Sequence, residues 1–127
     1  IDYAPTILDL AGVQVPDEMD GESFLPLLTG KKVKNWRKSL FYHYFEYPAE
    51  HAVRRHYGVR TERYKLIKFY GHDIDNWELY DLQNDPREMN NIYNHPSYAK
   101  VQKELHRELV KLAKKYDDPL EKNAIQN

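Results

Sequence analysis

Apolar positions toward the C-terminal end of the chain recur at helical spacing. After Pro96 they come three or four residues apart, at Tyr98, Val101, Leu105, Leu109, Leu112 and Tyr116. This spacing puts them on one face of a helix, and the opposite face carries mostly Lys, Arg and Glu. Proline is tolerated at the first helical position, so the pattern predicts an amphipathic helix from Pro96 to Tyr116.

The N-terminal segment predicts a short helix. Asp2 is a suitable N-cap, Pro5 is tolerated in the first turn, and Gly12 can end the helix in the left-handed conformation. Isolated helices below ~12–15 residues are marginal in water. The following loop carries a dense apolar run at Phe24–Leu28, more than a solvated loop would show. We expect both segments to dock on a larger body.

Between residues 40 and 82 the pattern becomes that of strands, and most of the aromatic residues lie there. Short connections between strands indicate an antiparallel meander. The predicted fold class is α+β, a four-stranded antiparallel sheet packed against the C-terminal helix. The predicted strands are Leu40–Tyr47, Ala52–Arg60, Arg63–Tyr70 and Trp77–Leu82.

Composition narrows the function classes. The chain has 127 residues, 19 Lys and Arg against 20 Asp and Glu, and a net charge of −1. A pI of 6.7 argues against a general nucleic-acid binder, for which a pI above ~9 is usual. No apolar run approaches the ~18 residues of a membrane span. The absence of Cys excludes disulfides, thiolate metal sites and a cysteine nucleophile on this chain.

Self-contained catalytic and metal-binding motifs are absent from the sequence. The histidines at positions 43, 51, 56 and 72 do not form a helical i, i+4 pair. A metal site would therefore need tertiary assembly. The sequence predicts no catalytic and no metal-binding residue on this chain.

A run of cations occupies the second and third predicted strands. Arginine forks could bind sulfate, phosphate or carboxylate groups there. The following residues 73–90 are acidic, so the cations could instead pair with the fourth strand, and alternation along the third strand favours this structural reading. The cations are Arg54, Arg55, Arg60, Arg63, Lys65 and Lys68.

The segment at the junction between the loop and the second predicted strand is the strongest candidate for binding. It offers two histidines and two arginines, at His51, Arg54, Arg55 and His56. Tyr47 and Tyr57 flank it and could stack on a sugar ring. Loops set on a rigid sheet often carry binding residues. An equally good alternative is that one histidine is buried and hydrogen-bonded to backbone while the arginine pair is solvated.

Four segments, in order, resemble the C-terminal part of a type I sulfatase. The sequence is similar in character to bacterial enzymes that act on sulfated glycans. The four segments are 2–12 (DYAPTILDLAG), 19–30 (MDGESFLPLLTG), 58–67 (GVRTERYKLI) and 78–88 (ELYDLQNDPRE). The resemblance implies that residues 1–35 are the tail end of a catalytic α/β domain of the alkaline-phosphatase type. Residues 36–127 would be the C-terminal sulfatase subdomain.

The resemblance also implies what lies elsewhere. The Cys- or Ser-x-Pro-x-Arg motif that yields formylglycine is not in this sequence, and neither are the family's calcium ligands. The parent would be a calcium-dependent sulfuric ester hydrolase that is periplasmic or secreted, and the isolated fragment would be inactive. The fragment would form one wall of the substrate cleft. A sulfated carbohydrate would face His51, Arg54, Arg55 and His56.

Two other functions remain open at this point. One is a free-standing module that binds anionic glycans through Tyr47, Tyr57, Arg54 and Arg55. The other is the C-terminal part of a related phosphoesterase. The expected partners of the sulfatase are the sulfated carbohydrate and the missing catalytic domain, with no nucleic acid and no membrane span.

Overall fold

The computed structural model describes residues 1–119 of the chain. The chain divides into two compact units, Ile1–Trp36 and the part from Arg37 onward. No helix among the described residues has the length and apolar character needed to cross a membrane.

The first unit is built around α1 (Tyr3–Leu10) and the single turn α2 (Leu25–Leu28). Thr6 links the two, since its hydroxyl donates to the Asp2 carbonyl at 2.6 Å and accepts from the Phe24 amide at 3.0 Å. Gly12 has a φ of 69° beyond the end of α1, which confirms its predicted role as a left-handed stop. Asp2 occupies the N-cap position, but its carboxylate accepts from the Glu22 amide rather than from the helix.

Much of the apolar surface of this unit stays open. Pro5 is fully buried, whereas Tyr3 is 76% exposed and Ile7 63% exposed. Phe24 packs edge-on against Tyr3, with ring centroids 5.7 Å apart. The side of α1 that carries Tyr3 and Ile7 is therefore largely open inside its own unit.

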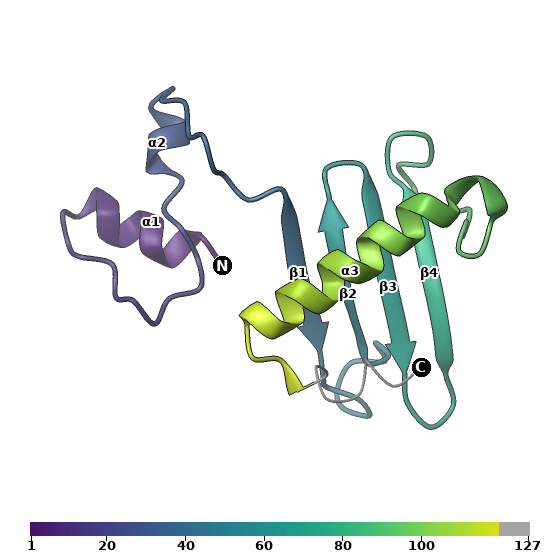
Figure 1. The fold of residues 1–127 in the computed structure, drawn as a ribbon. Coiled ribbons are helices and arrows are strands. Elements are labelled where there is room, and N and C mark those ends of the chain that lie inside the picture. Colours follow the sequence, from purple (N-terminus) through teal and green to yellow (C-terminus); the bar gives the residue numbers. More distant parts are fainter. Residues whose placement is uncertain (120–127) are drawn as a thin grey trace. The chain divides into compact units, whose positions relative to one another are not determined.

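The second unit confirms the predicted α+β fold. Its sheet has the order β1–β2–β3–β4, with every neighbouring pair antiparallel. After a 3₁₀ turn, η1 (Pro96–Tyr98), the long helix α3 (Ala99–Lys115) crosses one face of the sheet diagonally (Figure 1). The strands are β1 (Ser39–Tyr44), β2 (His56–Thr61), β3 (Tyr64–Tyr70) and β4 (Asp75–Asp81).

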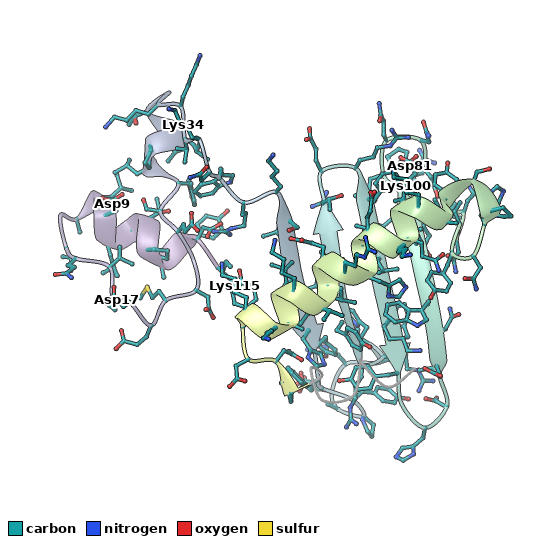
Figure 2. All side chains as sticks on the ribbon, viewed as in Figure 1. Asp9, Asp17, Lys34, Asp81, Lys100 and Lys115 are labelled. Atoms are coloured by element: carbon teal, nitrogen blue, oxygen red, sulfur yellow. The ribbon has the colours of Figure 1, made fainter. Side chains whose placement is uncertain are left out.

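The core lies between the sheet and α3. Side chains alternate across a strand, so every second residue points at the helix. From the helix, the predicted apolar stripe supplies Leu105, Leu109 and Leu112. The sheet supplies Tyr57, Val59, Leu66 and Leu79. Lys100 and Lys115, labelled in Figure 2, lie near the two ends of α3 and are both exposed.

Two strand boundaries differ from the predictions in a way that matters for the site. The first strand was predicted to reach Tyr47 but ends at Tyr44, and the second was predicted from Ala52 but begins at His56. The last paired residues are Tyr44 and His56. Beyond them the pairing of β1 with β2 stops, so His51, Arg54 and Arg55 lie in a loop.

Candidate functional site

The loop from Phe45 to Arg55, hereafter the 45–55 loop, joins β1 to β2 and carries three of the four predicted binding residues. The fourth, His56, is the first residue of β2. Within the loop, all residues from 48 to 53 are exposed, and Arg54 and Arg55 are half-buried. The candidate site therefore has an exposed part and a partly covered base.

Arg54 is held by two side chains. One guanidinium nitrogen donates to the Tyr47 hydroxyl and pairs with the Asp73 carboxylate. The guanidinium carbon lies 4.4 Å from the centre of the Tyr47 ring, a cation–π contact. Arg54 is thus engaged by Tyr47 from the start of its own loop and by Asp73 from the turn between β3 and β4.

Arg55 joins the two ends of the loop. Its Nε donates to the Phe45 carbonyl at 2.9 Å, and its own carbonyl accepts the Tyr70 amide at 3.1 Å. The first contact closes the loop at its base, and the second attaches it to the end of β3. These bonds satisfy backbone groups that lie beyond the last β1–β2 pair, Tyr44 and His56.

His56 lies on the face of the sheet opposite α3. Its Nδ1 is 2.8 Å from the Arg54 carbonyl. Its ring stacks on Tyr44 at a centroid distance of 5.6 Å and lies 5.3 Å from the Phe69 ring. The environment of His56 resembles the alternative given for this segment, in which one histidine is buried and hydrogen-bonded to backbone.

His51 has a different environment. It is exposed, and no hydrogen bond or ion pair connects it to another residue in the described range 1–119. The structure therefore brings Arg54 and Arg55 together at the base of the loop, leaves His51 in the exposed part, and places His56 on the sheet. The four predicted residues do not converge on one point.

Of the two tyrosines proposed to stack on sugar, Tyr57 was wrongly predicted. It is 6% exposed and belongs to the core under α3. Burial is the main cause that raises the pKa of its hydroxyl to about 12. Tyr47 is half-buried, and Arg54 lies over its ring.

A buried chain of polar groups near the loop was not predicted. His43 Nδ1 lies 2.8 Å from Asp118 and Nε2 lies 2.7 Å from the Tyr70 hydroxyl, while the His43 side chain is only 4% exposed. A carboxylate only accepts, so Nδ1 carries the proton, and Nε2 of a neutral ring accepts from Tyr70. Burial, together with Asp118, raises the pKa of Tyr70 and outweighs the opposite effect of Arg55. These residues are far apart in sequence and share no local motif.

The structural reading of the basic strand is confirmed for three cations. Arg63 pairs with Asp81, Lys65 with Glu88 at 2.6 Å, and Lys68 with Asp75. All three carboxylates come from β4 or the loop after it. The third strand is thus cross-linked to its acidic neighbour rather than presented as an anion-binding surface.

The described residues offer no place for the calcium ion that the resemblance implies. Among residues 1–119, no group of three His, Asp or Glu side chains is arranged to hold a metal. Asp73 and Asp118, which lie near the candidate loop, are paired with Arg54 and His43.

Comparison with known proteins identifies the fold. An N-acetylglucosamine-6-O-sulfatase from Bacteroides thetaiotaomicron is 54% identical over 98% of this chain and 23% of its own length. A solved structure in complex with its substrate, D-glucosamine-2-N,6-O-disulfate, matches with a TM-score of 0.86 and 55% identity, over 93% of this chain and 24% of that one. A 2-O glycosaminoglycan sulfatase matches with a TM-score of 0.82 and 30% identity, over 95% and 26% of the two chains.

These matches define the chain as the C-terminal region of a sulfatase. It belongs to the family described as N-sulphoglucosamine sulphohydrolase, C-terminal, whose model matches residues 1–115. The chain spans about a quarter of the length of each of these three relatives.

Proposed function

We propose that this chain is part of a sulfatase that hydrolyses sulfate esters on sulfated, glucosamine-containing glycans. The observation that carries the proposal is the 54% identity, over nearly the whole chain, to an N-acetylglucosamine-6-O-sulfatase. The match to a structure whose substrate is a disulfated glucosamine supports the same substrate class.

In this proposal the nucleophile and the calcium ligands belong to a catalytic domain outside residues 1–127, and calcium with cationic side chains would stabilise charge on the sulfate there. The present chain supplies a wall of the substrate cleft. The segment from His51 to His56 borders the sugar and offers donors to an anionic group. By the same resemblance, the whole enzyme works in the periplasm or outside the cell.

We further propose that residues 1–35 complete the catalytic α/β domain. The support is the exposed apolar side of α1, where Tyr3, Ile7 and Leu10 are each more than 60% exposed. An apolar surface of this kind marks a contact with another part of a protein. Coverage of only 24% of the substrate-bound relative leaves ample chain to provide that contact.

The test is an assay of the enzyme encoded by the complete reading frame that contains this sequence. We expect calcium-supported release of sulfate from 6-O-sulfated glucosamine, and no turnover by residues 1–127 alone on a chromogenic aryl sulfate. A parallel assay with the matching phosphate ester separates the phosphoesterase alternative. Faster release of phosphate than of sulfate would overturn the proposal.

A chimera offers a second, independent measurement. Residues 1–127 replace the corresponding quarter of the Bacteroides thetaiotaomicron N-acetylglucosamine-6-O-sulfatase. Because the two regions are 54% identical, we expect a folded chimera that keeps 6-O-sulfatase activity. A folded chimera without activity would show that this chain serves another substrate.

A further inference from the structure

The 45–55 loop is closed at its base by two ties between its ends. Arg55 Nε bonds the Phe45 carbonyl at 2.9 Å, and Arg54 contacts Tyr47 through both the hydroxyl and the ring. The segment between these ties, residues 48–53, contains only exposed residues. The backbone on both sides of an exposed tip is therefore fixed.

Two further contacts attach the base to the sheet. Asp73, in the turn between β3 and β4, pairs with Arg54, and the Tyr70 amide bonds the Arg55 carbonyl at 3.1 Å. The Phe45 ring lies against His43, with centroids 3.5 Å apart, and His43 is anchored by Asp118 and Tyr70. The base thus has contacts to β1, to β3 and to the β3–β4 turn, and His43 of β1 is in turn bonded to Asp118 after α3.

Such a frame lowers the entropy that a loop loses when it binds a ligand, since the loop is already ordered. The exposed segment carries one acceptor and one donor suited to a sulfated sugar, Glu50 for a hydroxyl and His51 for a sulfate oxygen. Arg54, by contrast, holds Asp73 and Tyr47 through one guanidinium nitrogen, Nη1. A sulfate that took the place of Asp73 at Nη1 would break the contact between the loop and the β3–β4 turn.

We infer that residues 48–53 form a preordered recognition segment for the sulfated sugar, and that Arg54 is a positioning residue that acts through Asp73 and Tyr47. The inference rests on the proposed sulfatase function and deepens it. It separates Arg54 from His51 within the predicted binding set: Arg54 fixes the segment, and His51 meets the ligand.

The test is a double-mutant cycle in the complete enzyme with Arg54→Ala, Asp73→Asn and the pair. If Arg54 acts through Asp73, each single variant raises KM for the sulfated sugar by a similar factor of about ten, which corresponds to ~1.4 kcal/mol, and the pair is no worse than either. Changes in kcat should stay smaller than those in KM. Arg107→Ala, which removes an exposed arginine of α3, is the matched control and should keep wild-type KM.

Two results would overturn the inference. A raised KM in Arg54→Ala with a wild-type value in Asp73→Asn would show that Arg54 binds the sulfate directly, and additive effects in the pair would show the same. Amide hydrogen exchange at Tyr70, whose amide bonds the Arg55 carbonyl at the base of the loop, gives a readout without turnover, and both single variants should speed it. If the complete enzyme releases no sulfate, the proposed function fails, whereas unchanged exchange in both variants would refute the frame itself.

Discussion

Arg63 and Asp81 form a two-pronged ion pair that joins the start of β3 to the end of β4. Arg63 Nε lies 3.0 Å from one carboxylate oxygen and Nη2 lies 2.8 Å from the other. Asp81, labelled in Figure 2 near the end of β4, is 3% exposed and also accepts from the Asn84 side chain and the Gln83 amide. These bonds, those from Arg63 first, hold the pKa of the Asp81 carboxyl below its ordinary value.

Replacing Asp81 tests this linkage. Hydrogen bonds to a charged group contribute ~1.5–3 kcal/mol each, and Arg63 is half-exposed, so we expect Asp81→Asn to lower the free energy of unfolding by about 2 kcal/mol. The lowered pKa means that the contribution is present above the unfolded value near 4 and is lost as pH falls through the folded value. Urea unfolding between pH 7 and 2 should show a smaller loss of stability in Asp81→Asn than in the wild type.

The matched control for that series is Glu62→Gln, which removes an exposed carboxylate in the adjacent turn. It should keep the acid dependence of the wild type. An Asp81→Asn variant with an unchanged acid dependence would show that Asp81 does not supply it.

Gly58 and Tyr42 lie in close contact on the side of the sheet away from α3. A Cβ placed on Gly58 would lie 2.5 Å from the Tyr42 hydroxyl oxygen, and would also collide with the Leu66 carbonyl. Overpacking a filled site costs ~1–3 kcal/mol, and backbone cannot move aside, so we expect Gly58→Ala to reach the upper part of that range. The midpoint of urea unfolding measures it.

Tyr42→Phe should have the opposite sign. The Tyr42 hydroxyl is buried without a hydrogen-bond partner among the described residues, and burial is the main cause that raises its pKa. Removing an unpaired buried hydroxyl relieves a desolvation cost of ~1–3 kcal/mol, so the variant should be at least as stable as the wild type. A clear loss of stability in Tyr42→Phe would reveal a partner for that hydroxyl.

Local sequence patterns are sufficient to predict some elements of the fold. The spacing of apolar residues from Tyr98 to Tyr116 predicts α3, because an amphipathic helix buries one face and this pattern does not depend on which element it packs against. The hairpin between β2 and β3 was predicted within one residue, and Thr61 sets its turn by accepting from the Tyr64 amide at 2.9 Å. These elements depend on residues close together in the chain.

The candidate site was harder to predict because its contacts are long-range. Ala52 and Val53 were predicted to be part of a strand. In the structure they lie in a loop, where Arg54 pairs with Asp73 and Arg55 bonds the Phe45 carbonyl. The contact of His43 with Asp118 spans 75 residues. Residue types alone indicated that the segment contains several side chains able to bind a ligand. They did not indicate which of these side chains are bonded to other residues of the protein.

His106 predicts a second pH effect, at milder acidity. It is half-buried against Trp77, with ring centroids 4.5 Å apart, and its Nε2 lies 3.2 Å from the Tyr93 hydroxyl. Burial first, and then the charge of Lys68, lower the pKa of His106. The unfolded chain therefore binds a proton on this residue at a higher pH than the folded chain does, and stability falls as pH drops below the ordinary value of 6.5.

Unfolding in urea at pH 7.5 and at about pH 5 measures this effect, since a shift of one pKa unit corresponds to ~1.4 kcal/mol. His106→Gln should lose less stability between the two pH values than the wild type does. His72→Gln, which replaces an exposed histidine in the β3–β4 turn, is the control and should follow the wild type. An equal pH dependence in His106→Gln and the wild type would contradict the assignment.

The two histidines of the predicted binding set make the most direct test of the proposed cleft wall. In the complete enzyme, His51→Ala should raise KM for the sulfated sugar, because the substitution removes a hydrogen-bond donor to the anion. The fold should be unaffected, because the His51 side chain is exposed. His56→Ala should also change KM or kcat without unfolding the protein. Its effect reaches the sugar through Arg54, whose carbonyl His56 contacts at 2.8 Å.

Amide hydrogen exchange at Tyr70, whose amide bonds the Arg55 carbonyl, separates these two roles. His51→Ala should leave that exchange at the wild-type rate while it raises KM, because His51 lies in the exposed part of the loop. His56→Ala should speed the exchange, because His56 acts through the backbone at the base of the loop. Wild-type kinetics in both variants would place the 45–55 loop outside the substrate cleft.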